Sequence, residues 1–199
     1  VRPEYFLFLL LGTLGLSMIV SSVELITVFV ALELSSYALY LLVPLRRERT
    51  GLRMQMESAA KYVMFGVVAT GFLLFGMSYL YGMTGSTYFS QIAPALTQRW
   101  SEPAALAGIL LVMAGLLFKL AAFPMHLWAP DVYQGASNET TAFIAGVPKV
   151  AVVALMIRFL MCARPSGEAL MLALTAVAVG SMFFGNLAAL VQKDVKRML

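Results

Sequence analysis

Six long apolar stretches limit what this chain can fold into. They lie at roughly residues 4–21, 24–45, 57–82, 104–134, 139–162 and 168–191, and each is long enough to cross a lipid bilayer as a helix. A spanning segment must satisfy its own backbone hydrogen bonds, as a helix does. Only 12% of the residues are charged, against about a quarter in a soluble domain. The sequence therefore predicts an all-α, polytopic transmembrane helix bundle with about six spans.

The rest of the composition narrows the possible functions. No connection between the stretches is long enough to hold a soluble catalytic domain. The single cysteine, Cys162, excludes an internal disulfide and a metal site built from cysteines alone. No nucleotide, flavin, haem or iron–sulfur motif is present, so we expect no cofactor and no metal on this chain. We interpret residues 1–199 as one transmembrane domain and, from the missing initiator methionine and the abrupt end at Leu199, as a fragment of a longer chain.

The fourth stretch contains a helix breaker. Pro124 removes a backbone donor and clashes with the carbonyl four residues earlier, so the helix must kink or break near residues 123–124. Lys119 precedes the proline and His126 follows it. A broken helix at membrane depth is tolerated where protein or a water-filled cavity covers the freed backbone groups. This segment therefore predicts a discontinuous helix beside a polar path through the membrane.

Five ionisable residues fall inside the predicted spans, away from their obvious ends: Glu33, Lys61, Lys119, His126 and Lys149. A charge at the bilayer centre costs about 2.5–3.5 kcal/mol on insertion scales, so we expect these side chains to face the bundle interior, one another or water. A lysine taken out of water can release and regain a proton. A carboxylate at about 4 Å stabilises the charged lysine by roughly 4 kcal/mol at an effective dielectric constant near 20. Movement of Glu33 relative to Lys61 would thus control a proton relay that continues through the other three residues.

Each of these residues also has a purely structural interpretation. Lys61 could form an i,i+4 ion pair with Glu57 or extend toward the membrane surface. Lys149 follows a proline and could cap carbonyls that a kink sets free. Glu33 could belong to a structural ion pair, and His126 could be an interior histidine with its hydrogen bonds satisfied. The sequence leaves these alternatives open.

Basic residues outside the spans indicate an orientation. One side of the membrane would carry Arg2, Arg46, Arg47, Arg49, Arg53, Lys193, Lys196 and Arg197. The other side would carry only Arg99 and Arg164, with Arg158 near the end of its span. By the positive-inside rule, the basic loops 46–53 and 193–197 are expected on the cytoplasmic side. The same clustering accounts for the net charge of +4, so no nucleic-acid partner is expected.

Two further expectations concern packing. The residues between the third and fourth stretches, 83–103, are expected to form the longest loop. Gly66, Gly71 and Gly76 lie on one span, and we expect them to mark close packing against a neighbouring helix.

Four segments of the chain resemble a known family. They are Glu33–Tyr37, Glu57–Tyr62, Phe118–Gly135 and Gly185–Met198, and they occur in the order found in that family. The third contains the run Pro-x-His-x-Trp-x-Pro-Asp-Val-Tyr-Gln-Gly, which ends at Gly135. Over nearly its whole length the sequence resembles the antiporter-like subunits of respiratory complex I.

This resemblance implies both a fold and a function. The family's subunits contain two inverted repeats, and this chain would hold the first repeat and one further helix. By the resemblance, Glu33 matches the family's key glutamate, Lys61 the lysine of the next helix, Lys119 the central lysine of the broken helix, His126 the histidine after the break, and Lys149 the lysine of the helix that follows. The implied function is proton translocation by a membrane subunit of NADH:quinone oxidoreductase, coupled to electron transfer in other subunits.

The resemblance also implies partners and a location. The expected partners are other membrane subunits of the complex, the lipid bilayer, protons and, indirectly, the subunits of the redox arm. The expected location is the bacterial inner membrane. The redox cofactors would lie on other chains.

Three other functions remain open. The chain could be a homologous subunit of a cation/proton antiporter, of a membrane-bound hydrogenase, or of a ferredoxin- or deazaflavin-linked dehydrogenase. It could be a structural membrane scaffold in which the charges only pair helices. A free-standing solute transporter is the least favoured, because the sequence holds no second repeat against which the first could move.

Overall fold

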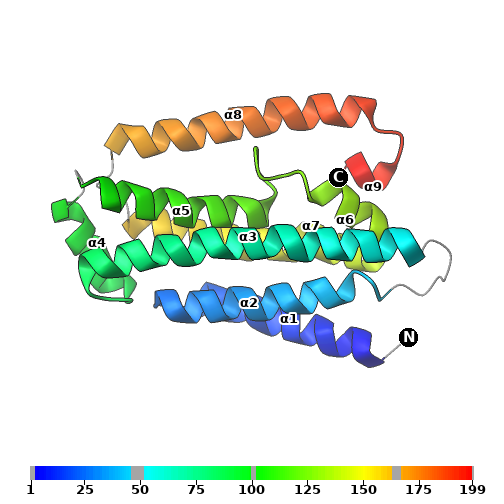
Figure 1. Cartoon of the computed structure of the whole chain (residues 1–199), viewed down its shortest axis with the longest axis horizontal. Helices are drawn as coiled ribbons and strands as arrows, with labels where there is room; N and C mark the ends of the chain where they lie inside the picture. Colours follow the sequence, from blue (N-terminus) through cyan, green and yellow to red (C-terminus); the bar gives the residue numbers. More distant parts are fainter. Residues whose placement is uncertain (1–2, 46–51, 100–101, 163–166, 199) are drawn as a thin grey trace.

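The computed structural model describes residues 3–45, 52–99, 102–162 and 167–198 (Figure 1). Within these residues, six helices are long and apolar enough to cross a membrane. They are α1 (Pro3–Ser21), α2 (Leu25–Leu42), α3 (Leu52–Thr84), α5 (Pro103–Leu120), α7 (Asn138–Cys162) and α8 (Gly167–Val191). The prediction of an all-α transmembrane bundle with about six spans is confirmed.

Three short helices complete the described structure: α4 (Phe89–Arg99), α6 (Ala129–Gly135) and α9 (Val195–Met198). The expectation of a loop at residues 83–103 was therefore wrong, because α4 occupies most of that segment. Its buried residues Phe89, Ile92 and Leu96 recur at helical spacing and form an apolar face. This face packs against α3 and α7 and covers one end of the bundle.

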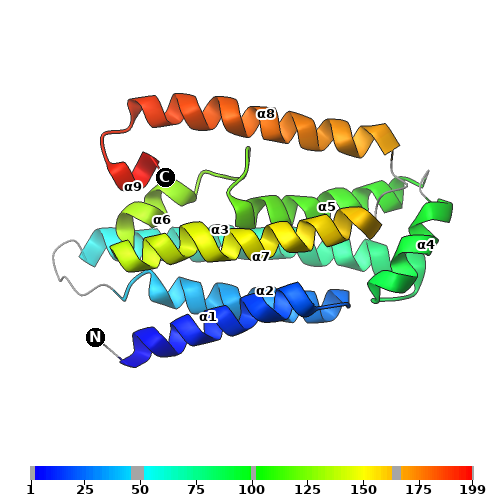
Figure 2. The ribbon, with the colours of Figure 1, turned by 180° about the vertical axis from the view of Figure 1, so that it is seen from behind.

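The long helices form a bundle with α8 along one edge. The most extensive helix contacts join α3 to α5 and α1 to α2. α7 lies behind α3 in Figure 1 and in front of it in Figure 2, and it contacts α1 and α5. None of residues 171–191 of α8 is buried. α8 is therefore the helix that the rest of the described chain covers least.

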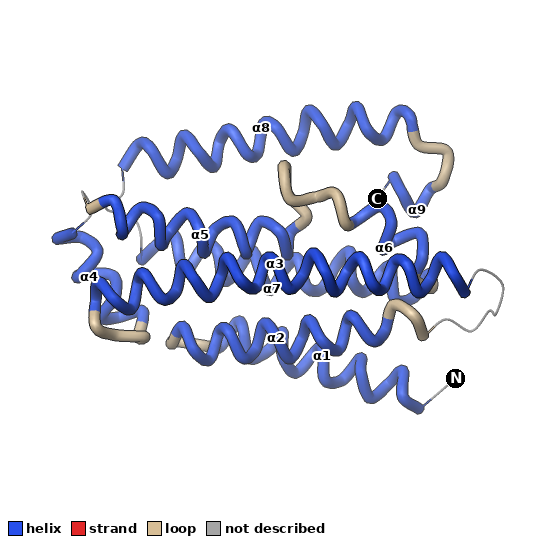
Figure 3. Tube along the Cα trace, in the orientation of Figure 1, coloured by secondary structure: helices blue, strands red, loops and turns tan. Residues whose placement is uncertain are grey.

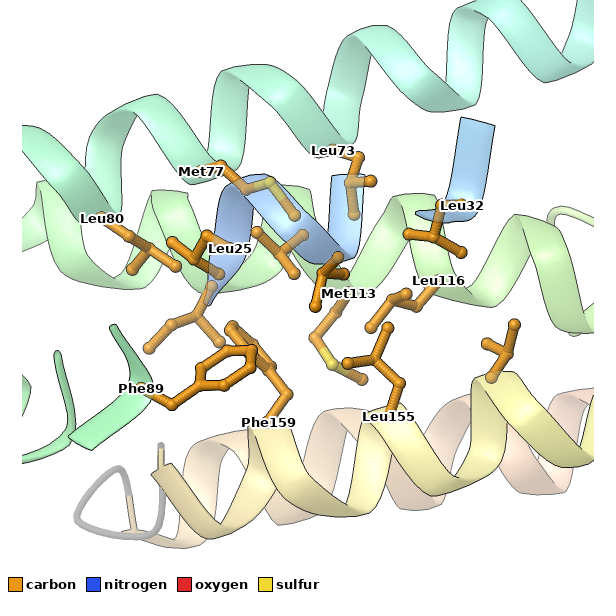
Figure 4. Close-up of a cluster of buried hydrophobic side chains, with 14 of the residues drawn as sticks. Leu25, Leu32, Leu73, Met77, Leu80, Phe89, Met113, Leu116, Leu155 and Phe159 are labelled. Carbon is orange, nitrogen blue, oxygen red and sulfur yellow. The ribbon is translucent and has the colours of Figure 1, made fainter. Parts of the chain in front are cut away.

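One apolar cluster joins seven of the described helices, all except α6 and α9, and Figure 4 shows its central part. Leucine, methionine and phenylalanine side chains from α2, α3, α4, α5 and α7 meet there. The labelled members are Leu25, Leu32, Leu73, Met77, Leu80, Phe89, Met113, Leu116, Leu155 and Phe159. This packing fixes α5 between α3 and α7, and so fixes the position at which α5 ends.

The glycines of α3 differ in how closely other atoms approach them. A Cβ atom at Gly76 would lie 2.6 Å from the backbone nitrogen of Val112 on α5, so α3 and α5 approach closely here. A Cβ atom at Gly66 would lie where the Tyr40 hydroxyl group stands. No atom lies within 4 Å of a Cβ at Gly71. The expectation of close packing holds for Gly66 and Gly76 and was wrong for Gly71.

The described arginines lie at the two ends of the bundle. Arg53 at the start of α3 and Arg197 on α9 lie at one end (Figure 1). Arg99 and Arg158 lie at the other end, where Arg158 Nη1 donates to the carbonyl of Val20 at 2.6 Å. The remaining arginines of the orientation argument lie outside the described residues: Arg2, Arg46, Arg47, Arg49 and Arg164.

Candidate functional site

The predicted helix break begins at Ala121. α5 ends at Leu120, and Ala121 adopts the left-handed conformation with φ 57° and ψ 36°. The Phe123–Pro124 peptide bond that follows is cis. After a loop that reaches toward α8, the chain continues in the same direction as α6 (Figure 3). The helix ends earlier than residues 123–124 because Pro124 has no N–H group to donate to the Leu120 carbonyl.

Side chains from other elements satisfy the backbone groups that the break sets free. The Phe123 amide donates to Ser181 Oγ of α8 at 2.9 Å. The Phe118 carbonyl accepts from the Ala121 amide at 2.9 Å and, in addition, from Trp128 Nε1 at 3.0 Å. Lys149 Nζ of α7 donates to the carbonyl of Lys119 at 2.8 Å. Such a bond from a charged donor contributes about 1.5–3 kcal/mol.

Lys149 therefore caps a freed carbonyl, as one structural interpretation held. The carbonyl belongs to α5 and not to the lysine's own helix. α7 continues through Pro148 from Asn138 to Cys162. A proline kink in α7 is thus not what provides the acceptor.

The Lys119 side chain points toward α2. Its ammonium group donates to Ser36 Oγ, and that hydroxyl group donates in turn to the Leu32 carbonyl. Glu33 lies one helical turn before Ser36 and accepts a hydrogen bond of 2.7 Å from Thr70 Oγ1 of α3. The hydroxyl group that binds Lys119 and the carboxylate of Glu33 therefore stand on the same helix, one turn apart.

An aromatic row connects the surroundings of the two lysines. Lys119 Nζ lies 5.8 Å from the centroid of the Tyr40 ring, and Lys149 Nζ lies 4.9 Å from that of Trp128. Tyr62 stands between these rings, with 4.7 Å between centroids on each side. A cation over an aromatic face gains about 0.5–2 kcal/mol. The row gives each ammonium group a favourable neighbour that carries no charge.

His126 faces a cavity of about 340 Å³ between α8 and the segment after the break. Polar groups that line it include Tyr133, Lys149, Ser181 and Arg197. His126 Nδ1 is buried and has no hydrogen-bond partner among the described residues. A cavity of this size has room for several water molecules, but Nδ1 itself is closed off from it.

Lys61 lies in a separate charged cluster at the end of the bundle that holds α9. Its ammonium group is 2.8 Å from Glu57 Oε1 and 2.8 Å from Asp131 Oδ2. Asp131 Oδ1 accepts from Arg197 Nη1 at 3.0 Å. The i,i+4 pair with Glu57, one of the structural interpretations, is therefore present. Glu33 is not the carboxylate that faces Lys61 in this structure.

Comparison with known proteins identifies the family. Residues 22–199 match the family described as NADH:quinone oxidoreductase/Mrp antiporter, TM. The chain belongs to this family. It is 54% identical over 198 residues to NADH-quinone oxidoreductase subunit N 2 of Opitutus terrae, covering 100% of this chain and 41% of that protein. The chain thus spans about two fifths of the length of the curated relatives it matches.

Solved structures of the antiporter-like fold agree with this assignment. A chain of respiratory complex I from Thermus thermophilus with bound aureothin superposes with a TM-score of 0.84 at 36% identity, covering 99% of this chain and 42% of that one. A chain of the Mrp complex from Dietzia sp. superposes with a TM-score of 0.86 at 22% identity, covering 96% and 35%. At that identity the second likeness shows the fold alone.

The resemblance to the antiporter-like subunits of complex I is confirmed. Within that family, the segments Glu57–Tyr62 and Phe118–Gly135 most resemble subunit N, and the curated relatives carry that name. The discontinuous helix is also confirmed as part of the antiporter-like fold.

The structure brings only some of the predicted relay residues of this antiporter-like chain together. Lys119 and Lys149 are in contact through a backbone carbonyl, and His126 lines the same cavity as Lys149. Glu33 and Lys61 each bind other partners. The proton-relay role of all five remains a prediction, as does the absence of a cofactor on this chain.

Sequence reasoning did not assign roles to several residues of the site. They are Ser36, Tyr40, Trp128, Asp131, Ser181 and Arg197. Trp128 and Asp131 stand in the run that carries the family resemblance, which could have drawn attention to them. The hydroxyl groups of Ser36 and Ser181 carry no such signal, because serine is common in membrane helices that pack closely.

Proposed function

We propose that this chain is part of a proton-translocating membrane subunit of NADH:quinone oxidoreductase. Protons pass through a relay of Glu33, Lys61, Lys119, His126 and Lys149. Electron transfer takes place on other subunits and drives this movement, and no redox cofactor binds to this chain.

The contact between Lys149 and the end of α5 carries the proposal. Lys149 Nζ lies 2.8 Å from the Lys119 carbonyl, at the break of a helix that is apolar enough to span a membrane. This bond joins the Lys149 ammonium group to the backbone of Lys119, whose own ammonium group is hydrogen-bonded to Ser36. Two lysines on adjoining helices within a bilayer affect each other's charge, since like charges repel strongly where water is scarce. When one lysine gains a proton, the loss of a proton from the other lysine is therefore favoured. The cavity beside Lys149 and His126 has room for the water that would carry it.

The relatives support the assignment to a larger assembly. The curated relatives are named NADH-quinone oxidoreductase subunits, and they are bacterial proteins. The partners of this chain are thus other membrane subunits, the lipid bilayer and, indirectly, the redox arm, with no nucleic acid involved. Its place is the bacterial inner membrane, with loops 46–53 and 193–197 on the cytoplasmic side.

Proton pumping by the intact complex tests the proposal. Lys119→Ala is compared with wild type in sealed vesicles, with NADH oxidation followed in the same sample. Lys193→Ala is the control, because Lys193 is an exposed lysine between α8 and α9. We expect Lys119→Ala to abolish pumping and to slow oxidation in an assembled complex, and Lys193→Ala to change neither. Normal pumping by assembled Lys119→Ala complex would refute the proposed relay.

The structural scaffold predicts a different result. If the charges only pair helices, Glu33→Gln and Lys119→Ala lower the yield of assembled complex, and the complex that does assemble pumps at the wild-type rate per NADH. Native gel electrophoresis and the ratio of protons pumped to NADH oxidised separate these two outcomes.

The fold alone does not distinguish a complex I subunit from an antiporter subunit, because the Mrp chain has the same fold. The names of the relatives at 45% and 54% identity favour complex I. Neighbouring genes for iron–sulfur and NADH-binding subunits would agree with this choice, and a cluster of cation/proton antiporter genes would contradict it.

A further inference from the structure

The Phe123 amide and the Lys119 carbonyl would be partners in an unbroken helix, since they stand four residues apart. In this structure each has another partner. Phe123 N donates to Ser181 Oγ at 2.9 Å, and the Lys119 carbonyl accepts from Lys149 Nζ at 2.8 Å. Ser181 of α8 thus accepts the hydrogen bond of the Phe123 amide, and the Lys119 carbonyl is left to accept from Lys149.

α8 leaves room for the Phe123 ring and packs against it. A Cβ atom at position 180 would lie 2.8 Å from Phe123 Cδ1, so only Gly180 leaves room for the ring. On the following turn, Phe184 stacks on Phe123 with 4.5 Å between centroids and 1° between planes. The loop after α5 reaches α8 at this place (Figure 3). Three nearby positions of α8 therefore contact one residue of the break.

Thr175, another hydroxyl residue of α8, serves as a comparison for Ser181. Thr175 Oγ1 donates to the Met171 carbonyl at 2.8 Å, as Ser181 Oγ does to the Val177 carbonyl at 2.7 Å. Thr175 is exposed, and its hydroxyl group bonds within α8. Ser181 combines this intrahelical bond with a second one to the break, and its donated proton leaves the lone pairs of Oγ to accept from Phe123.

We infer that Ser181, with Gly180 and Phe184, is a positioning residue for the proton relay, because it holds the Phe123 amide away from the Lys119 carbonyl and so keeps that carbonyl for Lys149. This inference rests on the proposed function. Without the hydroxyl group, the part-buried amide of Phe123 needs a new acceptor, and the carbonyl four residues earlier is the one that helix geometry offers. Lys149 then loses its partner.

The test uses the full subunit in the intact complex, with pumping and NADH oxidation measured in sealed vesicles. Ser181→Ala removes the acceptor, and Gly180→Ala keeps it but displaces the Phe123 ring. Each has a matched control. Thr175→Ala removes a hydroxyl group that bonds within α8, and Gly71→Ala adds to α3 a Cβ atom that would meet no atom within 4 Å.

We expect Ser181→Ala and Gly180→Ala to lower the rate of pumping by about five- to tenfold, the effect of losing one well-placed hydrogen bond. Both controls should pump as wild type does. Ser181→Thr keeps a hydroxyl group and should restore most of the rate. The pH at which pumping is half-maximal should move in Ser181→Ala, because the lysine that exchanges protons has lost its partner.

A double-mutant cycle shows whether Ser181 acts through the lysine. The cycle is read from the thermal midpoint of the assembled complex, because Lys149→Ala removes a residue of the relay itself. In a Lys149→Ala background, Ser181→Ala should lower the midpoint less than it does in wild type, since the group that it positions is gone. Equal losses in both backgrounds would overturn the inference. So would wild-type pumping by Ser181→Ala, or equal losses in Thr175→Ala. If Ser181→Ala lowers the yield of assembled complex, the comparison of Gly180→Ala with Gly71→Ala decides the question by itself.

The same vesicles separate this inference from the proposed function. If Lys119→Ala abolishes pumping while Ser181→Ala and Gly180→Ala pump normally, only the positioning role fails. If Lys119→Ala pumps normally, the relay itself fails, whatever the α8 variants do.

Discussion

Gly76→Ala should weaken the contact between α3 and α5, the pair of helices that carries Lys61 and Lys119. The new Cβ atom would lie 2.6 Å from Val112 N and 2.7 Å from the Gly108 carbonyl oxygen. Both are backbone atoms, which cannot rotate aside, so the helices must separate by several tenths of an ångström. Overpacking of this kind costs about 1–3 kcal/mol.

Gly71→Ala is the matched control on the same helix. Its Cβ atom would meet no atom within 4 Å, so it brings only the better helix propensity of alanine, at most about 1 kcal/mol. Gly76→Ala receives the same gain and bears the clash in addition. The free energy of unfolding of Gly76→Ala should therefore be lower than that of Gly71→Ala by about 1–3 kcal/mol.

Thermal inactivation of the purified complex in detergent measures the difference. At about 2–4 °C per kcal/mol for a domain of this size, the midpoint for Gly76→Ala should lie roughly 2–12 °C below that for Gly71→Ala. Equal midpoints for the two variants would refute the close approach of α3 and α5. A lower midpoint for Gly71→Ala would show that the exposed face of α3 is buried against a part of the assembly that this chain does not contain.

Two further substitutions probe the ends of the broken helix. Asp131→Asn should loosen α6 and α9, because it removes the charge on which a lysine of α3 and an arginine of α9 converge. Trypsin should then cleave faster after the exposed Lys193, whereas Glu102→Gln at the other end of the bundle should leave the cleavage rate unchanged. Trp128→Phe should lower the thermal midpoint, because the Phe118 carbonyl loses its indole donor and keeps only the Ala121 amide, at a cost of about 0.5–1.5 kcal/mol. An unchanged midpoint would show that the indole bond contributes nothing.

The helices could be predicted because their signals are local. Apolar stretches of membrane length define the six spans, and Pro124 marks the break within a few residues. α4 was missed because its apolar positions are separated by polar residues and a proline, which read as a loop. Its face at Phe89, Ile92 and Leu96 becomes visible only when the helical period is applied to a short segment.

The contacts of the site could not be predicted because they join distant parts of the sequence. Asp131 and Lys61 are separated by 70 residues, and Phe123 and Ser181 by 58. No local pattern encodes such pairs. The charged residues themselves were predictable from their cost in a membrane, whereas their partners depend on how the helices are packed. Lys61 illustrates this, because Glu57 on its own helix was foreseen as a partner and Asp131 was not.

The end of α5 has one more consequence, which comes from its backbone alone. The peptide dipoles of a helix add up to about half a negative charge at its C-terminal end. Here that end lies inside the bundle, and the Lys149 ammonium group is 2.8 Å from the carbonyl oxygen of Lys119 in its last turn. Interaction with a helix terminus is worth up to about 2 kcal/mol in partly buried geometry, a large part of the roughly 3 kcal/mol that a charge in a bilayer costs. A broken helix thus gives a membrane protein a fixed counter-charge that cannot be protonated, and it leaves the carboxylates of the chain free for other partners.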